Sequence, residues 1–412
     1  MGAHGGTSRG GTPGPARRPP GGAAGRTSSL EGALVGRYLG LIVKATRLCN
    51  LRCEYCHDWR SGPNQKMSFP VLARLTARAL ADPSHDAVEF IWHGGEPTVL
   101  PRLFYERAVY VQARLRRPGQ VIRNSLQTNG TRLDREWARF FRDFQFRVSV
   151  SLDGPPAVHD RYRRYASGRP SFDDVRRGLD VLRDNGVPLS VLMVIDRSAL
   201  ELGPDEIFDF FLREGITNYG LLAAKPTNQP DAPPGTLTSH YVTPAEMSRF
   251  LQAYFDRWLA HGDRSIRVRE FEGLLDRLSG RSARVCTLAG DCFGRYYLVE
   301  PDGEVAHCDL FLGDPGYTLG NVLSDSFASF REGPTLVRLR GSNERALTSL
   351  RDCPDFGVCN GWCPHERYIA SRHDPEFTSD CCGLSRLIAH MRERLGVAPP
   401  VPAPSPAPVT TP

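Results

Sequence analysis

Short hydrophobic runs alternate with amphipathic stretches through the middle of this chain. Runs rich in β-branched and apolar residues predict strands at Leu41–Ala45, Val88–Trp92, Val121–Leu126, Val148–Leu152, Leu189–Ile195 and Tyr219–Ala223. Apolar positions with a helical period predict helices at Phe69–Leu80, Leu103–Leu115, Arg135–Phe144, Phe172–Asp184, Pro204–Arg213 and Ala245–Leu259. Strands that alternate with helices form βαβ units around a parallel sheet. The sequence therefore predicts an α/β fold, whose six repeats favour an open or partial barrel over a closed one.

The length and composition set the domain organisation. A chain of 412 residues with 40% hydrophobic content can bury one large core and a smaller second unit. Residues 1–36, rich in Gly, Pro and Arg, and residues 397–412, rich in Pro, are expected to be disordered tails. Between them we expect a main α/β domain at 37–270 and a cysteine-rich domain at 271–396.

Charge and cysteine usage exclude several classes of protein. The net charge of +6 comes from scattered basic residues, some of them in the first tail, so we expect no nucleic-acid partner. No early apolar run resembles a secretion signal, and none approaches the roughly 18 residues of a membrane span, so we expect a cytoplasmic protein. In that compartment an odd count of 11 cysteines indicates metal or redox chemistry and not disulfides.

Distinctive residues follow the first four predicted strands. These strand ends carry a cysteine loop, Gly94-Gly95-Glu96-Pro97, Gln127-Thr128-Asn129-Gly130 and Ser151-Leu152-Asp153-Gly154. Ligands bind at the carboxyl ends of strands in parallel α/β folds. We therefore expect these four segments to face one pocket.

The cysteine loop, with Cys49, Cys53 and Cys56, has the spacing Cys-x3-Cys-x2-Cys. Thiolates are soft ligands that suit iron–sulfur clusters, and three of them on a short loop can bind three irons of a cubane and leave the fourth iron open. Structural zinc is the alternative, but it takes four closed ligands, and only His57 follows as a further candidate. The pattern favours the cluster.

The other strand ends allow two interpretations each. Gly94 and Gly95 let the backbone approach a ligand closely, or they form a strand-ending turn. Ser151 and Asp153 can bind ribose hydroxyls with Arg163 neutralising a carboxylate, or they cap a turn.

Cys49-x3-Cys53-Glu54-Tyr55-Cys56, followed by Gly-Gly-Glu-Pro after a second strand, resembles the radical S-adenosylmethionine (SAM) superfamily. The resemblance implies a partial (β/α)6 barrel whose open iron chelates the amino and carboxylate groups of SAM. It also implies reductive cleavage of SAM to a 5′-deoxyadenosyl radical, which abstracts a hydrogen atom from the substrate. The cofactor-binding residues that it implies are Tyr55, Gly94, Gly95, Glu96, Asn129, Ser151, Asp153 and Arg163.

The later cysteines resemble the SPASM extension, which holds auxiliary [4Fe–4S] clusters. The resemblance implies a first auxiliary cluster on Cys286, Cys292, Cys308 and Cys363. It implies a second on Cys353, Cys359, a late cysteine and a cysteine three residues before Cys353. That last position is Leu350 here. Cys381 is the expected late ligand and Cys382 a substitute for the missing one, so we expect one or two auxiliary clusters.

Among SPASM proteins the chain is similar to anaerobic sulfatase-maturing enzymes over roughly residues 40–395. The resemblance implies that Asp309, directly after Cys308, is the base that takes a proton from the substrate. A carboxylate between two redox centres suits that role, although it could instead orient the cluster. His93 stands where sulfatase maturases carry Gln, and it leaves the substrate open.

These features predict a radical SAM/SPASM oxidoreductase with three candidate activities. The first oxidises Cys or Ser of a sulfatase to formylglycine. The second crosslinks or oxidises side chains of a ribosomally made precursor peptide. The alternative is a dehydrogenase or epimerase acting on a small molecule such as a sugar or aminocyclitol. An open-iron cluster also implies a low-potential donor such as a flavodoxin or ferredoxin.

Overall fold

The structure of this protein is a computed structural model that describes residues 1–2, 37–56, 58, 65–227, 232–283, 285–311, 314–375, 377 and 383–398. The chain divides into a unit at Met1–Gly36, of which only Met1 and Gly2 are described, and a unit at Arg37–Pro412. The two predicted tails therefore lie almost entirely outside the described residues.

The strands of the second unit form one sheet, in the order β10-β9-β8-β1-β2-β3-β4-β5-β6-β7. Their bounds are β1 Tyr38–Lys44, β2 Ala87–His93, β3 Val121–Thr128, β4 Arg147–Ser151, β5 Leu189–Ile195, β6 Asn218–Ala223, β7 Arg267–Val268, β8 Tyr296–Val299, β9 Glu304–His307 and β10 Thr318–Asn321. Strands β1 to β7 run parallel to one another. The α/β fold with a parallel sheet is thereby confirmed, and β7 and β10 are the edges of the open sheet.

A helix follows each of the six predicted strands. These helices are α2 Phe69–Ala81, α3 Arg102–Leu115, α4 Arg135–Asp143, α6 Phe172–Asp184, α8 Pro204–Arg213 and α9 Pro244–His261, with α5 Pro156–Tyr162, α7 Arg197–Leu202 and α10 Arg269–Leu278 between or after them. Side-chain caps fix where several begin: Asp134 accepts from Trp137 N at α4, and Thr243 forms a capping box with Glu246 at α9. The predicted βα repeats are all present.

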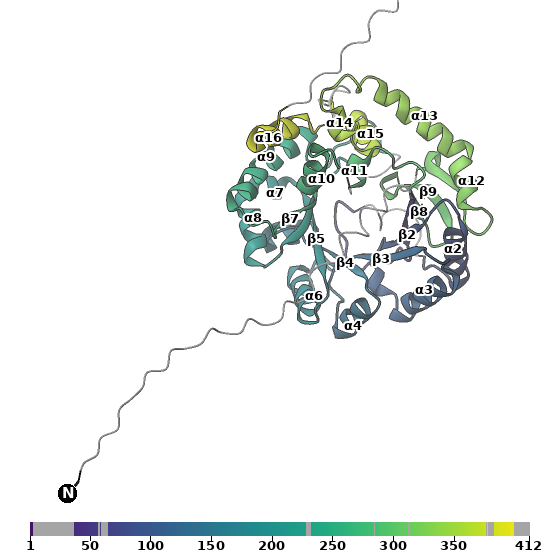
Figure 1. Ribbon diagram of the computed structural model, residues 1–412, viewed down its shortest axis with the longest axis horizontal. Coiled ribbons are helices and arrows are strands. Elements are labelled where there is room, and N and C mark those ends of the chain that lie inside the picture. The colour runs from purple at the N-terminus through teal and green to yellow at the C-terminus, as the bar shows by residue number, and fades with distance from the viewer. Residues whose placement is uncertain are drawn as a thin grey trace, which may run out of the picture. The chain divides into compact units, whose positions relative to one another are not determined.

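The two faces of the sheet differ in burial. In β2, Val88, Phe90 and Trp92 are buried, whereas Glu89, Ile91 and His93 on the opposite face are half-buried. Figure 1 shows α2, α3, α4 and α6 on the outer side of the strands. The main core therefore lies between these helices and the sheet, and the other face is left for polar side chains.

The C-terminal region continues the same sheet. Strand β8 pairs with β1 in parallel, and β9 and β10 follow as antiparallel strands. The remaining elements are α11 Cys286–Ala289, α12 Phe327–Glu332, α13 Pro334–Thr348, α14 Phe356–Cys359, α15 Pro364–His373 and α16 Ser385–Leu395, with short 3₁₀ turns at η2 Pro97–Val99, η3 Asp309–Phe311 and η4 Pro315–Tyr317. The expected boundary between residues 270 and 271 falls within α10, and the division into two domains stays a prediction.

None of the helices in the described ranges combines the length and the apolar character that crossing a lipid bilayer requires.

A glycine in α6 sets how closely this helix approaches the turn after β3. A Cβ atom at Gly178 would lie 2.1 Å from the carbonyl oxygen of Gly130. That oxygen belongs to backbone and cannot rotate away. Because Gly130 directly follows Asn129, the contact also fixes the position of a candidate site residue.

We predict that Gly178→Ala lowers the free energy of unfolding by about 1–3 kcal/mol, because the added methyl group forces α6 away from the turn. Gly341→Ala in α13 is the matched control, since its Cβ would meet only Arg345 Nη1, at 3.5 Å. In a helix interior that exchange should stabilise by about 0.5–1 kcal/mol. Denaturant unfolding followed by circular dichroism measures both, and equal effects of the two substitutions would contradict the prediction.

Candidate active site

The three early cysteines lie on the loop that leaves the carboxyl end of β1. Cys53 is buried, and Cys49 and Cys56 are half-buried. Backbone bonds fix the loop to the segment after α5: Arg52 N donates to Arg164 O at 2.7 Å, and Glu54 N donates to Tyr162 O at 3.0 Å. The structure thus holds the three thiols at the end of the sheet where the sequence places a pocket.

The donor set fits an iron–sulfur cluster. Burial, followed by the Asp58 carboxylate and the neighbouring Cys53, raises the pKa of Cys56 to about 12. Burial and the Glu96 carboxylate likewise raise the pKa of Cys49. Thiols in such a setting keep their protons unless a cation replaces them, and bound iron is such a cation.

Gly94 and Gly95 allow the segment after β2 to lie against the cysteine loop. Both have positive φ angles, of 81° and 51°. A Cβ at Gly95 would lie 2.4 Å from the carbonyl oxygen of Leu48, and Glu96 N donates to this oxygen at 2.7 Å. Close approach of two backbones therefore requires glycine at Gly95, and the Lys44 side chain requires it at Gly94. This agrees with the turn interpretation and leaves the ligand role a prediction.

The carboxylate of Glu96 is buried, with 1% of the residue exposed. Its Oε1 accepts from Thr98 N at 2.9 Å, from Thr98 Oγ1 at 2.6 Å and from Thr128 Oγ1 at 2.7 Å, and its Oε2 accepts from Asn129 N at 2.7 Å. Four donors satisfy the charge within the protein. Glu96 therefore joins the ends of β2 and β3, and only its backbone is left to approach a ligand.

Asn129 is fixed by the same bonds. Its Nδ2 donates to Asn50 Oδ1 at 2.9 Å and lies 3.9 Å from Cys49 Sγ, while its Oδ1 accepts from Thr131. Ser151, at the end of β4, accepts from Gln127 Nε2 at 2.8 Å. Both predicted residues thus lie at the carboxyl edge of the sheet, and Asn129 touches the cysteine loop.

Asp153, Arg163 and Tyr55 form one buried cluster. Asp153 Oδ2 accepts from Arg163 Nε at 2.7 Å and from the Tyr55 hydroxyl, and its Oδ1 accepts from Val194 N at 2.9 Å. Arg163 Nη1 lies 3.7 Å from Cys53 Sγ, and the guanidinium lies over the Tyr55 ring. Burial alone would lower the pKa of Arg163, but Asp153 raises it well above its usual value. Arg163 is therefore a fixed cation beside the cysteine loop.

The structure brings Cys286, Cys292, Cys308 and Cys363 together from separate segments of the C-terminal region. Burial raises the pKa of Cys286 to about 11, and the largest further contribution comes from Cys363. Burial, followed by Cys363 and Cys286, raises the pKa of Cys292, and both also act on Cys308. The four thiols therefore lie near one another, and their binding of one [4Fe–4S] cluster stays a prediction.

The ligands expected for a second auxiliary cluster are less complete. Cys359 is part of the main hydrophobic core, and Leu350 is buried as an apolar side chain. Cys353 follows α13 and is half-buried. Cys381, Cys382 and the zinc alternative His57 lie outside the described residues.

Within the described ranges no three His, Cys, Asp or Glu side chains converge tightly enough to hold a single metal ion. A cubane places less strict demands on thiol spacing, because each thiolate binds a different iron.

A buried network of charges, centred on Lys44, lies beside the cysteine loop. Lys44 is fully buried at the end of β1, and its Nζ donates to Asp58 Oδ1 at 2.9 Å and lies 3.1 Å from His93 Nδ1. Arg47 binds Glu300 through two bonds, of 2.9 and 2.6 Å, and also contacts Asp58. Burial alone would lower the pKa of Lys44, but the carboxylates around it raise that pKa. Lys44 is therefore held as a cation.

Asp309 joins this network from the C-terminal region. Its Oδ2 lies 3.6 Å from Lys44 Nζ and 3.9 Å from His93 Nδ1, and 19% of its side chain is exposed. The structure thus places Asp309 at the carboxyl end of β1, beside Cys308 and on the same side as the first cysteine loop. Its catalytic role stays a prediction.

Neither Lys44, Arg47 nor Glu300 carries a sequence signal that marks it as part of the site. The one available hint is that Lys44 ends an otherwise apolar strand, Tyr38–Lys44, which is an unusual place for a buried charge.

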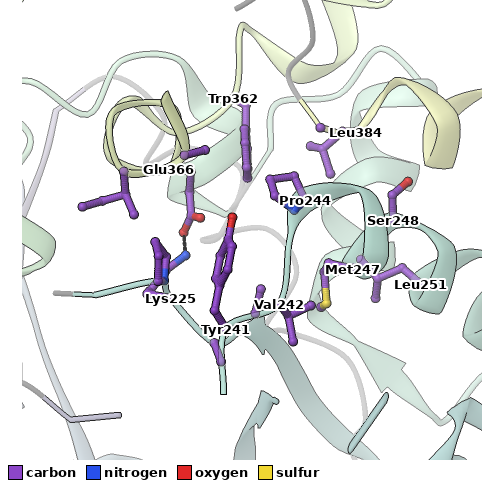
Figure 2. A pocket seen from close by; sticks show the side chains of 16 residues that line it. Lys225, Tyr241, Val242, Pro244, Met247, Ser248, Leu251, Trp362, Glu366 and Leu384 are labelled. Carbon is purple, nitrogen blue, oxygen red and sulfur yellow. Dashed lines mark hydrogen bonds and ion pairs between the residues drawn. The ribbon is translucent and has the colours of Figure 1, made fainter. Parts of the chain in front are cut away.

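A small cavity of about 50 Å³ lies between the end of β6, the start of α9 and helix α15 (Figure 2). Lys225 and Glu366 form an ion pair at one side, and Tyr241, Met247 and Trp362 contribute apolar surface. This volume suits one or two water molecules and is too small for a cofactor.

We predict that Lys44→Met lowers the free energy of unfolding by about 3–5 kcal/mol, because the carboxylates of Asp58 and Asp309 then lose the buried cation between them. Adding Asp58→Asn should restore part of the loss, which a double-mutant cycle measures. Lys66→Met is the control, since Lys66 is exposed. A Lys44 variant as stable as the Lys66 variant would contradict the structural role of the network.

Comparisons with known proteins agree with this geometry. The model of the radical SAM superfamily matches residues 43–199. A serine-type anaerobic sulfatase-maturating enzyme of Bacteroides thetaiotaomicron is 29% identical, over 84% of this chain and 87% of its own length. A cysteine-type anaerobic sulfatase-maturating enzyme of Clostridium perfringens strain 13 is 27% identical, over 87% of this chain and 97% of its own length.

Solved structures share the fold. Native anSMEcpe with bound AdoMet matches with a TM-score of 0.75 and 26% identity, over 87% of this chain and 98% of that one. Streptococcus suis SuiB bound to precursor peptide SuiA matches with a TM-score of 0.59 and 14% identity, over 86% and 77% of the two chains, which shows a shared fold. This chain therefore carries a radical SAM domain and is a relative of the anaerobic sulfatase-maturating enzymes.

Proposed function

We propose that this protein is a radical SAM oxidoreductase that modifies a residue of a peptide or protein substrate. One observation carries the proposal: the loop with Cys49, Cys53 and Cys56 and the Asp309 carboxylate from the C-terminal region lie around one buried cation, Lys44. The sulfatase-maturating relatives, and the structure of anSMEcpe with bound AdoMet and Cp18Cys peptide, support a polypeptide substrate.

Three thiols hold the proposed radical SAM cluster, namely those of Cys49, Cys53 and Cys56. When bound, the cluster and SAM supply a 5′-deoxyadenosyl radical that abstracts a hydrogen atom from the substrate. The backbone of Gly94, Gly95 and Glu96 would bind the amino group of SAM, since the Glu96 carboxylate already accepts its hydrogen bonds from within the protein. Arg163 offers a fixed positive charge to the carboxylate of SAM, while Asp153 and Tyr55 keep its guanidinium in place.

Asn129 and Ser151 complete the cofactor site from the ends of β3 and β4. Both side chains are oriented by bonds to neighbouring residues, Asn129 by Thr131 and Ser151 by Gln127. An oriented amide and hydroxyl at the edge of the sheet can bind the ribose and adenine of SAM without a further ordering cost.

Asp309 takes the proton that the substrate loses after hydrogen abstraction. Lys44 Nζ and His93 Nδ1 lie 3.6 and 3.9 Å from the same carboxylate oxygen, Oδ2, and keep the carboxylate in place. Cys286, Cys292, Cys308 and Cys363, the last of which caps α15, would hold an auxiliary cluster, which would supply an acceptor for the substrate electron. Leu350 stands where the second auxiliary cluster would need a cysteine ligand. A second cluster would therefore have four ligands only if both late cysteines, Cys381 and Cys382, join Cys353 and Cys359.

The reaction is an oxidation of the substrate. His93 and Asp58 both contact Lys44 and so form part of the surroundings of Asp309. Formation of formylglycine and crosslinking of a precursor peptide remain the two candidate products, and mass spectrometry of the modified peptide distinguishes them. A flavodoxin or ferredoxin supplies the electron that cleaves SAM. Because an open cluster is sensitive to oxygen, the enzyme must be handled without air, and a cytoplasmic location suits it.

We predict that the anaerobically reconstituted protein converts SAM to 5′-deoxyadenosine when reductant is added, and that Cys53→Ala abolishes this activity because the cluster loses a ligand. Chromatography measures the nucleoside, and iron analysis should show the loss of about one cluster per chain. Glu54→Gln, an exposed position in the same loop, is the control. Absence of 5′-deoxyadenosine from wild-type protein with its full iron content would overturn the proposed function.

We predict that Asp309→Asn still forms 5′-deoxyadenosine but loses most of the peptide product, by about 100-fold or more, because an amide cannot take the substrate proton. The ratio of product to 5′-deoxyadenosine, measured with a peptide that the wild-type enzyme modifies, reports this uncoupling. Asp302→Asn, an exposed carboxylate in the turn between β8 and β9, should leave the ratio unchanged. An unchanged ratio in the Asp309 variant would refute its role as the base.

A further inference from the structure

A groove in the C-terminal region lies between α13, α15 and the two 3₁₀ turns η3 and η4. It has a volume of about 360 Å³. We call it the α13 groove and define it by its apolar lining, which is Phe293, Phe311, Tyr317, Leu339, Leu350 and Tyr368. None of these residues is a proposed ligand of SAM or of a cluster, and Leu350 stands where the second auxiliary cluster lacks one.

The floor of the α13 groove is aromatic and firmly packed. The rings of Phe311 and Tyr317 stack with centroids 3.8 Å apart, and Tyr368 packs against Phe311 with a centroid distance of 6.0 Å. Leu339 and Leu350 are buried beside them. A packed apolar floor of this kind takes up a large apolar side chain with little reorganisation.

The rim of the groove is basic. Three exposed arginines of α13 each bond to a groove residue or its neighbour: Arg338 donates to Gly316 O, Arg340 to Phe293 O at 3.3 Å, and Arg345 to Ser342 Oγ at 3.0 Å. Over the part of the chain that the structure describes, none of these three arginines forms an ion pair, and Glu344, the one acid of α13, pairs with Arg351.

One carboxylate near this rim, that of Asp314, does not outweigh the charge of the three arginines, because Glu344 is already paired with Arg351. Asp314 is the carboxylate before η4, and its Oδ1 accepts from Gly316 N at 2.8 Å. Each guanidinium has five N–H donors, of which the bonds above use one or two. The remaining donors can pair with carboxylates of a bound chain.

From the apolar floor and the arginines beside it we propose that the α13 groove docks an acidic segment of the peptide substrate. An aromatic or large aliphatic side chain of that segment is its anchor. The inference rests on the proposed function and adds the substrate's chemistry. A concave groove that accepts side chains fits a peptide better than a redox protein, whose transient encounters use small and flat contacts.

The groove and the candidate base share one turn of chain. Phe311 forms the floor, and Asp309 begins the same 3₁₀ turn, η3. A segment bound in the groove is thereby held at a fixed distance from Asp309. Binding energy from this remote segment can then position the residue that reacts.

Binding of peptides without turnover tests the inference. A random peptide library is selected on the reconstituted wild-type protein, and the enriched peptides are labelled with fluorescein and titrated by anisotropy. We expect them to combine several Asp or Glu residues with an aromatic residue or Leu, and to bind more weakly as salt concentration rises.

Two variants change the groove from the outside. Arg338→Glu with Arg345→Glu reverses the rim charge, and Ala346→Trp fills the groove from an exposed position on α13. Each should weaken binding by about tenfold or more. Arg114→Glu with Arg139→Glu makes the same change in net charge on α3 and α4, at exposed sites, and should leave affinity unchanged.

Enriched peptides that bind both groove variants like wild type, or that carry no acidic residues, would overturn the inference. An acidic flavodoxin added to the same proteins tests the other occupant. If it loses binding in the groove variants while the peptides do not, the surface docks a redox protein and the peptide proposal is wrong. Formation of 5′-deoxyadenosine by the wild-type protein is measured separately, so failure of the proposed function is distinguishable from failure of peptide docking.

Discussion

The site depends on a single buried cation. Lys44 is fully buried, and a lone ammonium group in that position is very costly, so folding must bring carboxylates to it. Asp58 comes from the cysteine loop and Asp309 from the C-terminal region, while His93 ends the neighbouring strand. The requirement to neutralise Lys44 thereby joins three distant segments. The buried Lys44 side chain also requires a glycine at position 94, because a Cβ of Gly94 would lie 2.1 Å from it.

The same principle orders the remaining strand ends. Glu96 and Asp153 are buried carboxylates, and each accepts several hydrogen bonds from residues of the next strand or loop. Removing any donor would leave part of a buried charge unpaired, so these bonds resist rearrangement. The result is a rigid edge of the sheet, on which Asn129 and Arg163 are held beside the cysteine loop. Rigidity of this kind lets a site bind its ligand without an ordering cost.

The C-terminal region contributes chemistry because its first strand extends the main sheet. Strand β8 pairs with β1, so Glu300, just after β8, lies next to Arg47, just after Lys44. Strand β9 then runs back antiparallel to β8, and directly after it Asp309, which follows Cys308, brings its carboxylate to 3.6 Å from Lys44 Nζ. Phe311, in the floor of the α13 groove, belongs to the same 3₁₀ turn as Asp309. The proposed docking of a substrate in this groove would therefore hold the bound segment close to the candidate base.

The sequence by itself determined the βα repeats and the positions of the polar strand ends, because periodicity and turn chemistry are local properties. It also predicted the cysteine loop and the four thiols that gather in the C-terminal region. The strands β7 to β10 were not predicted, since they are short, and β7 and β8 in addition pair with strands far away in sequence, β6 and β1. Only the tertiary structure decided that the Glu96 and Asp153 carboxylates turn inward and that Lys44, Arg47 and Glu300 belong to the site. Pairing of buried charges depends on which segments meet in a medium of low dielectric constant, and no local pattern encodes that meeting.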